Sequence, residues 1–327
     1  MATTQTPQFI QQHQIDDLAL AQEAADGLRQ TAAHVSPKFF YDRLGSCLFD
    51  AICELPEYYP TRTETAILAE NAAAIAQAVL AKTGPAPSLI DLGAGNCAKG
   101  ERLFGPLAPR RYIAVDISVE FLRQALNRLQ RENPGLSLVG LGQDFSTQLK
   151  LPAQLRDGPQ DGPALVFYPG SSIGNFSPVA ALTLLRQARE AAQGGAMLIG
   201  VDLVKAVSLL GPAYDDALGV TAAFNLNLLS HLNRLLGADF KFADWRHLAL
   251  FNAQDSRIEM HLVARHAVTA RWPGGERHFA TDERIHTENS YKWQIDSFSA
   301  LLRDAGFANV QHWTDAQGWF GVFLASD

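Results

Sequence analysis

The chain has 327 residues and a formal net charge of −7 at pH 7, so it is acidic overall and holds one large domain or two modest ones. Lys and Arg form no long block, which argues against a nucleic-acid partner, because phosphate binding needs a clustered basic surface. No run of 18 apolar residues occurs, and the N-terminal residues lack the order of a signal peptide. We therefore expect a soluble cytoplasmic protein without a membrane partner.

The cysteine and histidine patterns give no metal or disulfide signal. The three cysteines form no CxxC pair, and the nine histidines are scattered without a spacing typical of metal ligands. We expect neither structural disulfides nor a bound metal.

The N-terminal third combines helices with two aromatic segments. Residues 16–33 and 64–82 have the composition and apolar spacing of amphipathic helices. Between them, residues 36–46 and 49–62 are rich in Phe and Tyr. Tyrosine offers a large apolar face and a hydroxyl, so these segments suit a pocket wall as well as plain core packing.

The stretch 88–100 is the strongest local signal in the chain. An apolar run typical of a strand ends at Gly93 and Gly95, and a polar segment able to form a helix follows. Glycines are needed where a backbone turns sharply and lets a ligand approach. The spacing predicts a nucleotide-like ligand, but with Ala98 it also fits the dinucleotide fingerprint, so the nucleotide stays open.

Two acids follow the next predicted strands. Asp116 ends the strand at 112–116, about 20 residues past the glycine turn, where a carboxylate accepts hydrogen bonds from ribose hydroxyls. Asp144 follows the strand at 136–142 and suits an adenine amino group, with Phe145 packing beside it or presenting its backbone N–H.

The remaining elements predict a parallel sheet with an insertion. Strands at 164–168 and 196–202 alternate with a helix, and Asn175 follows the first of them. Ligands in such sheets bind beyond the carboxyl ends of the strands, where Gly93, Asp116, Asp144 and Asn175 all fall. Residues 205–290 interrupt the alternation of strands and helices with a predicted antiparallel sheet of their own. A helix and two closing strands complete the chain. That ending favours a methyltransferase sheet over a dinucleotide dehydrogenase, which needs a second βαβαβ half.

Several stretches together resemble the L-histidine Nα-methyltransferases of ergothioneine biosynthesis. The similarity runs from about Ser36 to the C-terminus. The stretches LPEYYPTRTE and FYPGSSIGNF are specific to this group, whereas the glycine turn is generic to methyltransferases. The stretches are PKFFYDRLGS, LPEYYPTRTE, LIDLGAGNCAKG, FYPGSSIGNF, YDDALGVTAAFNLNLL and IHTENSYKW.

The resemblance implies a fold and a division of the chain. The fold is the Rossmann-like α/β fold of class I S-adenosylmethionine (SAM)-dependent methyltransferases, a mostly parallel seven-stranded sheet with an inserted α+β domain. Residues 62–204 and 291–327 would form the SAM-binding domain, and residues 1–61 and 205–290 the substrate-binding domain. We expect a monomer, although the sequence does not settle the oligomeric state.

The resemblance also implies a reaction, namely three successive methyl transfers from SAM to the α-amine of L-histidine, which give hercynine. Alignment of the amine with the sulfonium methyl supplies most of the catalysis in such an in-line displacement. The substrate ammonium must first lose a proton, and the sequence does not assign the group that accepts it. The quaternary product cation could rest on aromatic faces near Tyr41 and Phe39.

Each site residue takes a role from the family motif that it matches. Glu288 and Ser290 offer partners to the imidazole, whereas tryptophan has a single indole N–H, which favours histidine as substrate. Tyr58 and Tyr59 are adjacent, and we favour Tyr58 as the contact. The candidate catalytic residues are Tyr41 and Glu288; the substrate-binding residues are Tyr58, Asn175, Tyr214, Met260, Glu288 and Ser290; the SAM-binding residues are Gly93, Lys99, Asp116, Asp144 and Phe145.

Other interpretations of these residues stay open at this point. Glu288 could cap a strand or pair with Lys292 on the surface, Asn175 could serve only a turn, and Lys99 could be a solvated helix charge. At the level of function, the alternatives are an N-methyltransferase for tryptophan or another amine, a SAM-binding protein without turnover, and an NAD-dependent dehydrogenase.

Overall fold

The computed structural model describes residues 5–12, 17–117, 119–156 and 162–327. By its internal contacts the chain forms two compact units. The first contains Arg62–Leu203, Trp293–Asp327 and the N-terminal strand, and the second contains Ile15–Thr61 and Val204–Lys292. Within the described residues, no helix combines the length and the apolar character that crossing a membrane requires.

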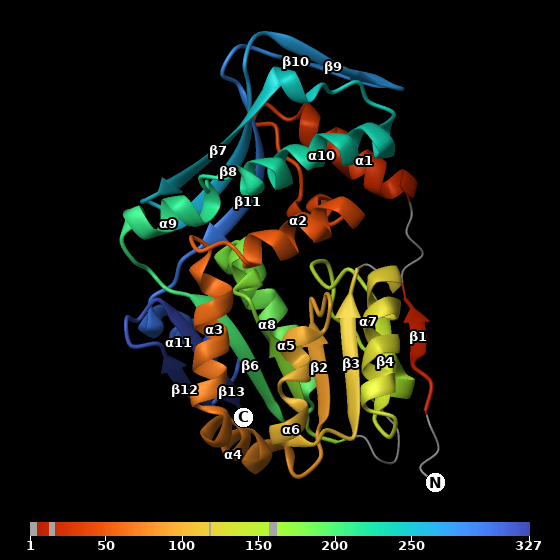
Figure 1. Ribbon diagram of the computed structural model, residues 1–327, viewed down its shortest axis with the longest axis vertical. Helices are drawn as coiled ribbons and strands as arrows, with labels where there is room; N and C mark the ends of the chain where they lie inside the picture. Colours follow the sequence, from red (N-terminus) through yellow and green to blue (C-terminus); the bar gives the residue numbers. More distant parts are fainter. Residues whose placement is uncertain (1–4, 13–16, 118, 157–161) are drawn as a thin grey trace. The chain divides into compact units, whose positions relative to one another are not determined.

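The first unit is built on an eight-stranded sheet (Figure 1) with the order β1-β4-β3-β2-β5-β6-β13-β12. All neighbouring strands are parallel except β13, which runs antiparallel to both β6 and β12. The order and the antiparallel β13 are those of the class I SAM-dependent methyltransferase fold. The strands are β1 (Gln8–Gln11), β2 (Ser88–Leu92), β3 (Arg111–Asp116), β4 (Ser137–Gly142), β5 (Ala164–Tyr168), β6 (Ala196–Asp202), β12 (Asn309–Thr314) and β13 (Phe320–Ser326).

The prediction of seven strands was wrong by one. β1 pairs in parallel with β4 and extends the sheet at its edge, whereas the sequence analysis placed this segment in the substrate-binding domain. The strand has only four residues, and its pairing depends on residues more than a hundred positions away, so no local pattern announces it.

Helices cover both faces of this sheet. Alternate residues of each strand point to opposite faces, so Ile90 belongs to one apolar core with α8 and α11, and Leu89 to another with α3, α4 and α7. The helices of the unit are α3 (Tyr59–Glu70), α4 (Ala72–Thr83), α5 (Ala98–Glu101), α6 (Phe104–Leu107), α7 (Val119–Glu132), α8 (Pro178–Ala192) and α11 (Ile295–Asp304), with the 3₁₀ turns η2 (Ala153–Leu155) and η3 (Ser172–Asn175).

The segment 64–82, predicted as one helix, is interrupted at Asn71. Its side-chain amide donates to the Ile67 carbonyl at 2.9 Å, and its backbone leaves the helical region at ψ 13°. The Ile67 carbonyl thus accepts from both the side-chain amide and the backbone N–H of Asn71, the latter at 3.1 Å. The result is the separate helices α3 and α4.

The second unit combines helices with two antiparallel sheets (Figure 1). The larger sheet has the order β11-β8-β7, and the smaller pairs β9 with β10. The elements are α1 (Asp17–Arg29), η1 (Pro37–Phe40), α2 (Arg43–Cys53), α9 (Val207–Tyr214), α10 (Val220–Leu236), η4 (Phe242–Asp244), β7 (Trp245–Asn252), β8 (Arg257–Ala264), β9 (Val268–Trp272), β10 (Gly275–Phe279) and β11 (Arg284–Tyr291).

A bulge in β11 decides which side chains share a face of this sheet. His286 pairs with His261 and Glu288 with Met260, and the register shifts between the two β11 residues. On a regular strand, two residues that are two positions apart, such as His286 and Glu288, point to the same face. The bulge instead leaves His286 on the face of His261 and turns Glu288 to the face of Met260.

Candidate functional site

The glycine turn after β2 has the backbone that its sequence predicts. Gly93 and Gly95 have φ values of 66° and 51°, a region that a side chain disfavours. The amide N–H of Gly93 donates to the Val115 carbonyl at 2.9 Å, and that of Gly95 donates to the Asp116 carboxylate at 3.0 Å. The loop is thereby fastened to the carboxyl end of β3.

Asp116, Asp144 and Phe145 lie at the carboxyl ends of β3 and β4, as expected. Asp144 accepts from the Ser146 amide at 3.0 Å, which fixes the start of its loop. The Phe145 ring stands edge-on to Tyr168, 5.7 Å between centroids, and a Cβ on Gly93 would lie 3.7 Å from Phe145 Cζ. The Phe145 ring and the Asp116 carboxylate therefore lie beside the glycine turn, an apolar face and an acceptor that fit an adenosine group.

Lys99 is an ion-pair partner of a buried acid, so the interpretation as a solvated charge was wrong. Its Nζ lies 2.7 Å from Glu64 Oε2, and Glu64 is only 1% exposed. The other oxygen of Glu64 accepts from the Gly170 amide at 2.8 Å. Glu64 thus joins the helix after β2 to the loop after β5, and the sequence analysis missed it because a single Glu in a helix carries no signal.

Asp91, on β2 itself, is a second acid that the sequence analysis missed. Its Oδ2 accepts from the Tyr112 hydroxyl at 2.6 Å, and its buried Oδ1 has no hydrogen-bond partner among the described residues. Burial raises the pKa of Asp91 to about 7, against the opposing hydrogen bond from Tyr112. An unpaired acceptor this close to the glycine turn suits a ligand that carries a positive charge, as SAM does in its ammonium and sulfonium groups.

The second unit gathers an aromatic cluster that includes three predicted site residues. The Tyr58 ring lies edge-on to Tyr214, with centroids 6.5 Å apart, and to Phe49, at 6.3 Å. Tyr41 contacts Phe49 at 5.7 Å and Phe224 at 5.9 Å. Burial raises the pKa of Tyr58 well above its usual value, so its hydroxyl stays neutral. The cluster offers aromatic faces to a substrate or to a cation.

Tyr59 points into a different environment from Tyr58. It is 2% exposed, and its hydroxyl accepts from Lys205 Nζ at 2.8 Å. The aromatic cluster with Tyr214 contains Tyr58 instead. This arrangement favours Tyr58 as the substrate contact, which is the choice made from the sequence.

A polar row is formed by Glu288 and Ser290 near the end of β11 and by Lys292 directly after it. Glu288 is 9% exposed, which excludes its pairing with Lys292 on the surface. Burial raises the pKa of Glu288 to about 7, and the Lys292 charge opposes that rise. Ser290 Oγ lies 2.7 Å from the Tyr214 hydroxyl. A buried carboxyl and a buried hydroxyl pair therefore share one face of the sheet with Met260, whose partner in the ladder is Glu288.

Asn175 is the remaining predicted substrate contact. It ends η3 in the first unit, beyond the carboxyl end of β5. The other predicted substrate contacts all belong to the second unit. The role of Asn175 toward the substrate stays a prediction.

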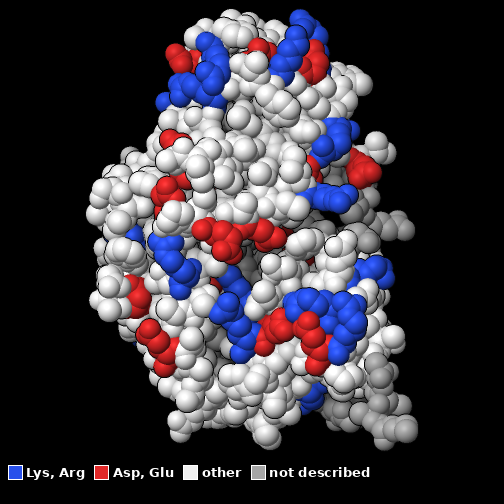
Figure 2. Space-filling view, viewed as in Figure 1, with Lys and Arg blue, Asp and Glu red and all other residues white. Residues whose placement is uncertain are grey.

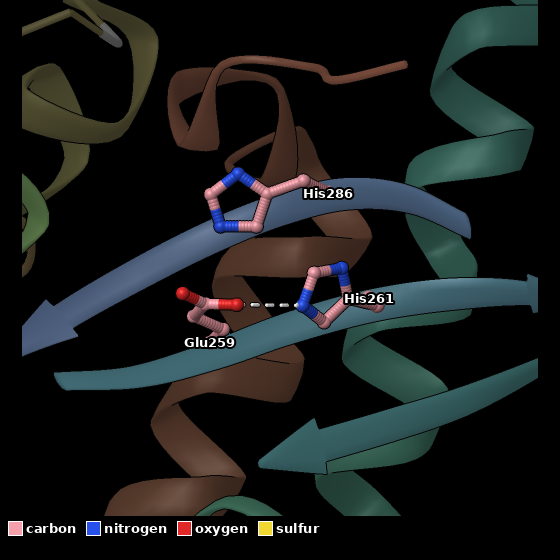
Figure 3. Close-up of side chains that lie close together, drawn as sticks. All are labelled: Glu259, His261 and His286. Carbon is pink, nitrogen blue, oxygen red and sulfur yellow. Dashed lines mark hydrogen bonds and ion pairs between the residues drawn. The ribbon is translucent and has the colours of Figure 1, made fainter. Parts of the chain in front are cut away.

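The opposite face of the three-stranded sheet carries a cluster of histidines and an acid (Figure 3). His261 and Glu259 are joined by a 3.1 Å hydrogen bond, and the ring of His286 lies 5.0 Å from that of His261. Arg257 also holds the Glu259 carboxylate, at 2.7 Å. Burial raises the pKa of Glu259, but hydrogen bonds from Asn252, Arg257 and His261 outweigh it and lower the pKa to about 2.

Burial lowers the pKa of His261 to about 4, so the imidazole is neutral at pH 7. Three donor atoms of this cluster lie within 4.8 Å of one another, a spacing that a metal ion could use. The Arg257 guanidinium, however, already pairs with the Glu259 carboxylate, although the buried Nδ1 of His261 has no hydrogen-bond partner among the described residues. The expectation of no metal stays a prediction.

Charges of both signs are interspersed on the face drawn in Figure 2. Lys and Arg groups there are separated by Asp and Glu groups and by uncharged surface. The view therefore gives no reason to revise the predicted absence of a nucleic-acid partner, which stays a prediction, as does the monomeric state.

Comparison with known proteins identifies the family. The chain is 39% identical to "Histidine N-alpha-methyltransferase" of Mycolicibacterium smegmatis over 94% of each chain. It is 37% identical to the protein of the same name from Mycobacterium tuberculosis, over 94% of this chain and 95% of that protein. It is 27% identical to "N-methyltransferase imqF" of Aspergillus flavus, over 92% of this chain and 83% of that protein. Residues 20–327 match the family model described as "Histidine-specific methyltransferase, SAM-dependent". By this match over most of its length and by these identities, the chain belongs to the histidine-specific SAM-dependent methyltransferase family.

Proposed function

We propose that this protein transfers methyl groups from SAM to the α-amine of L-histidine, three in succession, and so makes hercynine for ergothioneine biosynthesis. The observation that carries the proposal is the polar row on β11. Glu288 supplies a buried acceptor, and the Ser290 and Tyr214 hydroxyls, 2.7 Å apart, supply a buried donor on the same face. A neutral imidazole has one N–H and one lone pair, and these two partners match both.

The cofactor site is proposed in the first unit. When bound, SAM supplies an activated methyl group on a sulfonium. Gly93 leaves room for close approach, Asp116 accepts from ribose hydroxyls, and Asp144 with Phe145 receives the adenine. Lys99, held by Glu64 at 2.7 Å, stands beside the methionine part. These residues bind and orient the donor, and alignment supplies most of the rate enhancement in such a displacement.

The substrate residues are proposed to orient the amine and to exclude water. Glu288 and the Ser290 and Tyr214 pair grip one side of the imidazole, and Tyr58 packs beside it. Tyr41 lies at the amine, where its ring and that of Phe224, 5.9 Å apart, form faces for the growing cation. The α-ammonium loses its proton before each attack, and Tyr41 and Glu288 are the candidate groups to receive it.

An N-methyltransferase acting on tryptophan or another amine is the second candidate, because the relative from Aspergillus flavus is named only as an N-methyltransferase. Tryptophan offers a single indole N–H and no ring acceptor. Bound tryptophan would leave one of the two buried partners without a hydrogen bond. The free-energy cost of an unpaired buried polar group is what lets such a site reject the wrong substrate.

Mass spectrometry of the purified protein with SAM and either amino acid separates the two candidates. Histidine should gain one, two and then three methyl groups, and tryptophan none. A methylated tryptophan with unchanged histidine would refute the substrate assignment. In calorimetry, S-adenosylhomocysteine should bind more tightly than NAD, and the reverse order would refute the cofactor site.

A further inference from the structure

Lys292 closes a triangle of polar atoms beside Glu288. Its Nζ lies 2.7 Å from the Tyr214 hydroxyl and 2.8 Å from Ser290 Oγ, and these two oxygens are 2.7 Å from each other. The ammonium also lies 4.7 Å from the centre of the Tyr214 ring. Lys292 is only 3% exposed. A buried lysine is uncommon and costly unless its charge is paired and hydrogen-bonded, so its placement here calls for a reason.

The ammonium fixes the direction of the neighbouring hydroxyl protons. Lysine donates hydrogen bonds and accepts none, so both oxygens must turn a lone pair toward Nζ. One hydroxyl then donates to the other across the 2.7 Å contact. The proton of the accepting hydroxyl has to point away from the triangle. Ser290 and Tyr214 together thus present an outward hydrogen-bond donor, whichever of the two carries it.

Two positions on β11 and the residue that directly follows the strand complete the pattern. Glu288, Ser290 and Lys292 are two residues apart, and their side chains share the face of the sheet that carries Met260. Glu288 supplies an acceptor beside the outward donor.

We propose that Lys292 is a positioning residue for substrate selection, because it holds the Ser290 and Tyr214 hydroxyls in the orientation that donates to the unprotonated ring nitrogen. The inference rests on the proposed histidine methylation and extends it to a residue that touches no substrate atom. It explains why a lysine is buried at this place, where an apolar residue would fill the space at less cost. Without the ammonium, the two hydroxyls rotate freely and offer acceptor and donor alike.

The experiment compares two substrates in the unchanged protein and in four variants of it. The probes are L-histidine and pyrrol-3-ylalanine, whose ring keeps an N–H but lacks the acceptor nitrogen. The proteins are the unchanged chain, Lys292→Met, Ser290→Ala, the double variant Lys292→Met/Ser290→Ala and the control Lys205→Met. Lys205 also donates to a tyrosine hydroxyl, that of Tyr59, at 2.8 Å, and lies over its ring at 4.5 Å, so the control removes a similar contact away from the triangle.

The unchanged protein should prefer histidine in kcat/KM, and Lys292→Met should reduce this preference about 10- to 100-fold, mainly through the KM for histidine. Lys205→Met should keep the preference. The double variant Lys292→Met/Ser290→Ala should lose no more preference than Ser290→Ala alone, because the lysine acts through the hydroxyl pair.

A preference unchanged in Lys292→Met would overturn the inference, while methylation of histidine by the unchanged protein would keep the proposed function intact. Failure of the unchanged protein to methylate histidine would refute the proposed function instead. Should Lys292→Met not fold, as judged by its thermal transition, Lys292→Arg keeps a donor and should retain most of the preference. Ser290→Ala should then lose it, and equal preferences in these two variants would overturn the inference.

Discussion

Lys99 and Glu64 form an ion pair with 2.7 Å between Nζ and Oε2, although they are 35 residues apart in the sequence. The carboxylate is almost fully buried and also accepts from the Gly170 amide. One side chain of α3 therefore connects α5, whose Lys99 is proposed to stand beside SAM, with the loop after β5.

Glu64→Gln should weaken the binding of S-adenosylhomocysteine about tenfold. The neutral amide forms no ion pair with Lys99, and it has only one acceptor oxygen for the two donors, Lys99 and the Gly170 amide. Losing a charge-assisted hydrogen bond has effects of this size. Calorimetry measures the affinity. The control Glu101→Gln removes the more exposed pair with Arg128, at 3.0 Å, and should leave the affinity unchanged. Equal effects of the two variants would mean that Glu64 acts only on stability.

Glu288→Ala should raise the KM for histidine at least about tenfold and leave S-adenosylhomocysteine binding nearly unchanged. The variant removes a buried acceptor and leaves the imidazole N–H unpaired. Glu276→Ala, which removes an exposed acid on β10, is the matched control. Equal losses of substrate and cofactor affinity would show that Glu288 is structural.

The KM for histidine should rise as the pH falls below about 7. Burial raises the pKa of Glu288 to about 7, against the opposing charge of Lys292, so the carboxyl is protonated below that pH and cannot accept from the ring N–H. The imidazole of the substrate histidine titrates in the same pH range. In Glu288→Gln only the substrate titrates, so the difference between the two pH profiles gives the contribution of the Glu288 carboxyl. Identical pH profiles for the two proteins would contradict the assignment.

Asp91 should make the ligand-free protein less stable as the pH rises. Burial raises the pKa of this carboxyl from 3.8 to about 7, so its favourable contribution is complete below pH 3.8 and is lost as the pH rises through 7. The difference corresponds to at most ~4 kcal/mol. Asp91→Asn should remove this slope, measured by urea unfolding between pH 4 and 8. A slope that persists in the variant would assign it to other groups.

Dialysis against a chelator should leave methylation of histidine unchanged. The three-donor cluster of Glu259, His261 and His286 lies on the face of the sheet opposite Glu288, and Arg257 neutralises its carboxylate. The activity assay before and after dialysis measures this. Loss of activity that zinc restores would contradict the prediction, and His261→Ala would then test whether the cluster holds the ion.

The sequence predicts most of the first unit because its signals are local. Gly93 and Gly95 predict a turn because glycine adopts backbone conformations that other residues disfavour. Asp116 and Asp144 could be found because they come at or after the ends of apolar runs typical of strands. The helix break at Asn71 and the edge strand β1 were missed. The first depends on one side-chain hydrogen bond, and the second on a pairing partner that is remote in the chain.

The candidate site divides in the same way. The residue types of Tyr58, Glu288 and Ser290 could be chosen from the motifs that resemble a known family, whereas their environments could not. Burial of Glu288, the choice of Tyr58 over Tyr59 in the aromatic cluster, and the contact of Lys292 with Tyr214 all require elements far apart in the sequence to pack together.

By itself, then, the sequence determined most strands and helices of the first unit and the glycine turn, because backbone preference and apolar periodicity act over a few neighbouring residues. The residues proposed to bind the imidazole came from the resemblance to a known family. Only the tertiary structure decided which charges are buried and which polar side chains lie within hydrogen-bond distance of one another. Desolvation and hydrogen-bond geometry depend on what packs around a group in space: Glu64 beside Lys99, and the β11 bulge that places Glu288 and His286 on opposite faces.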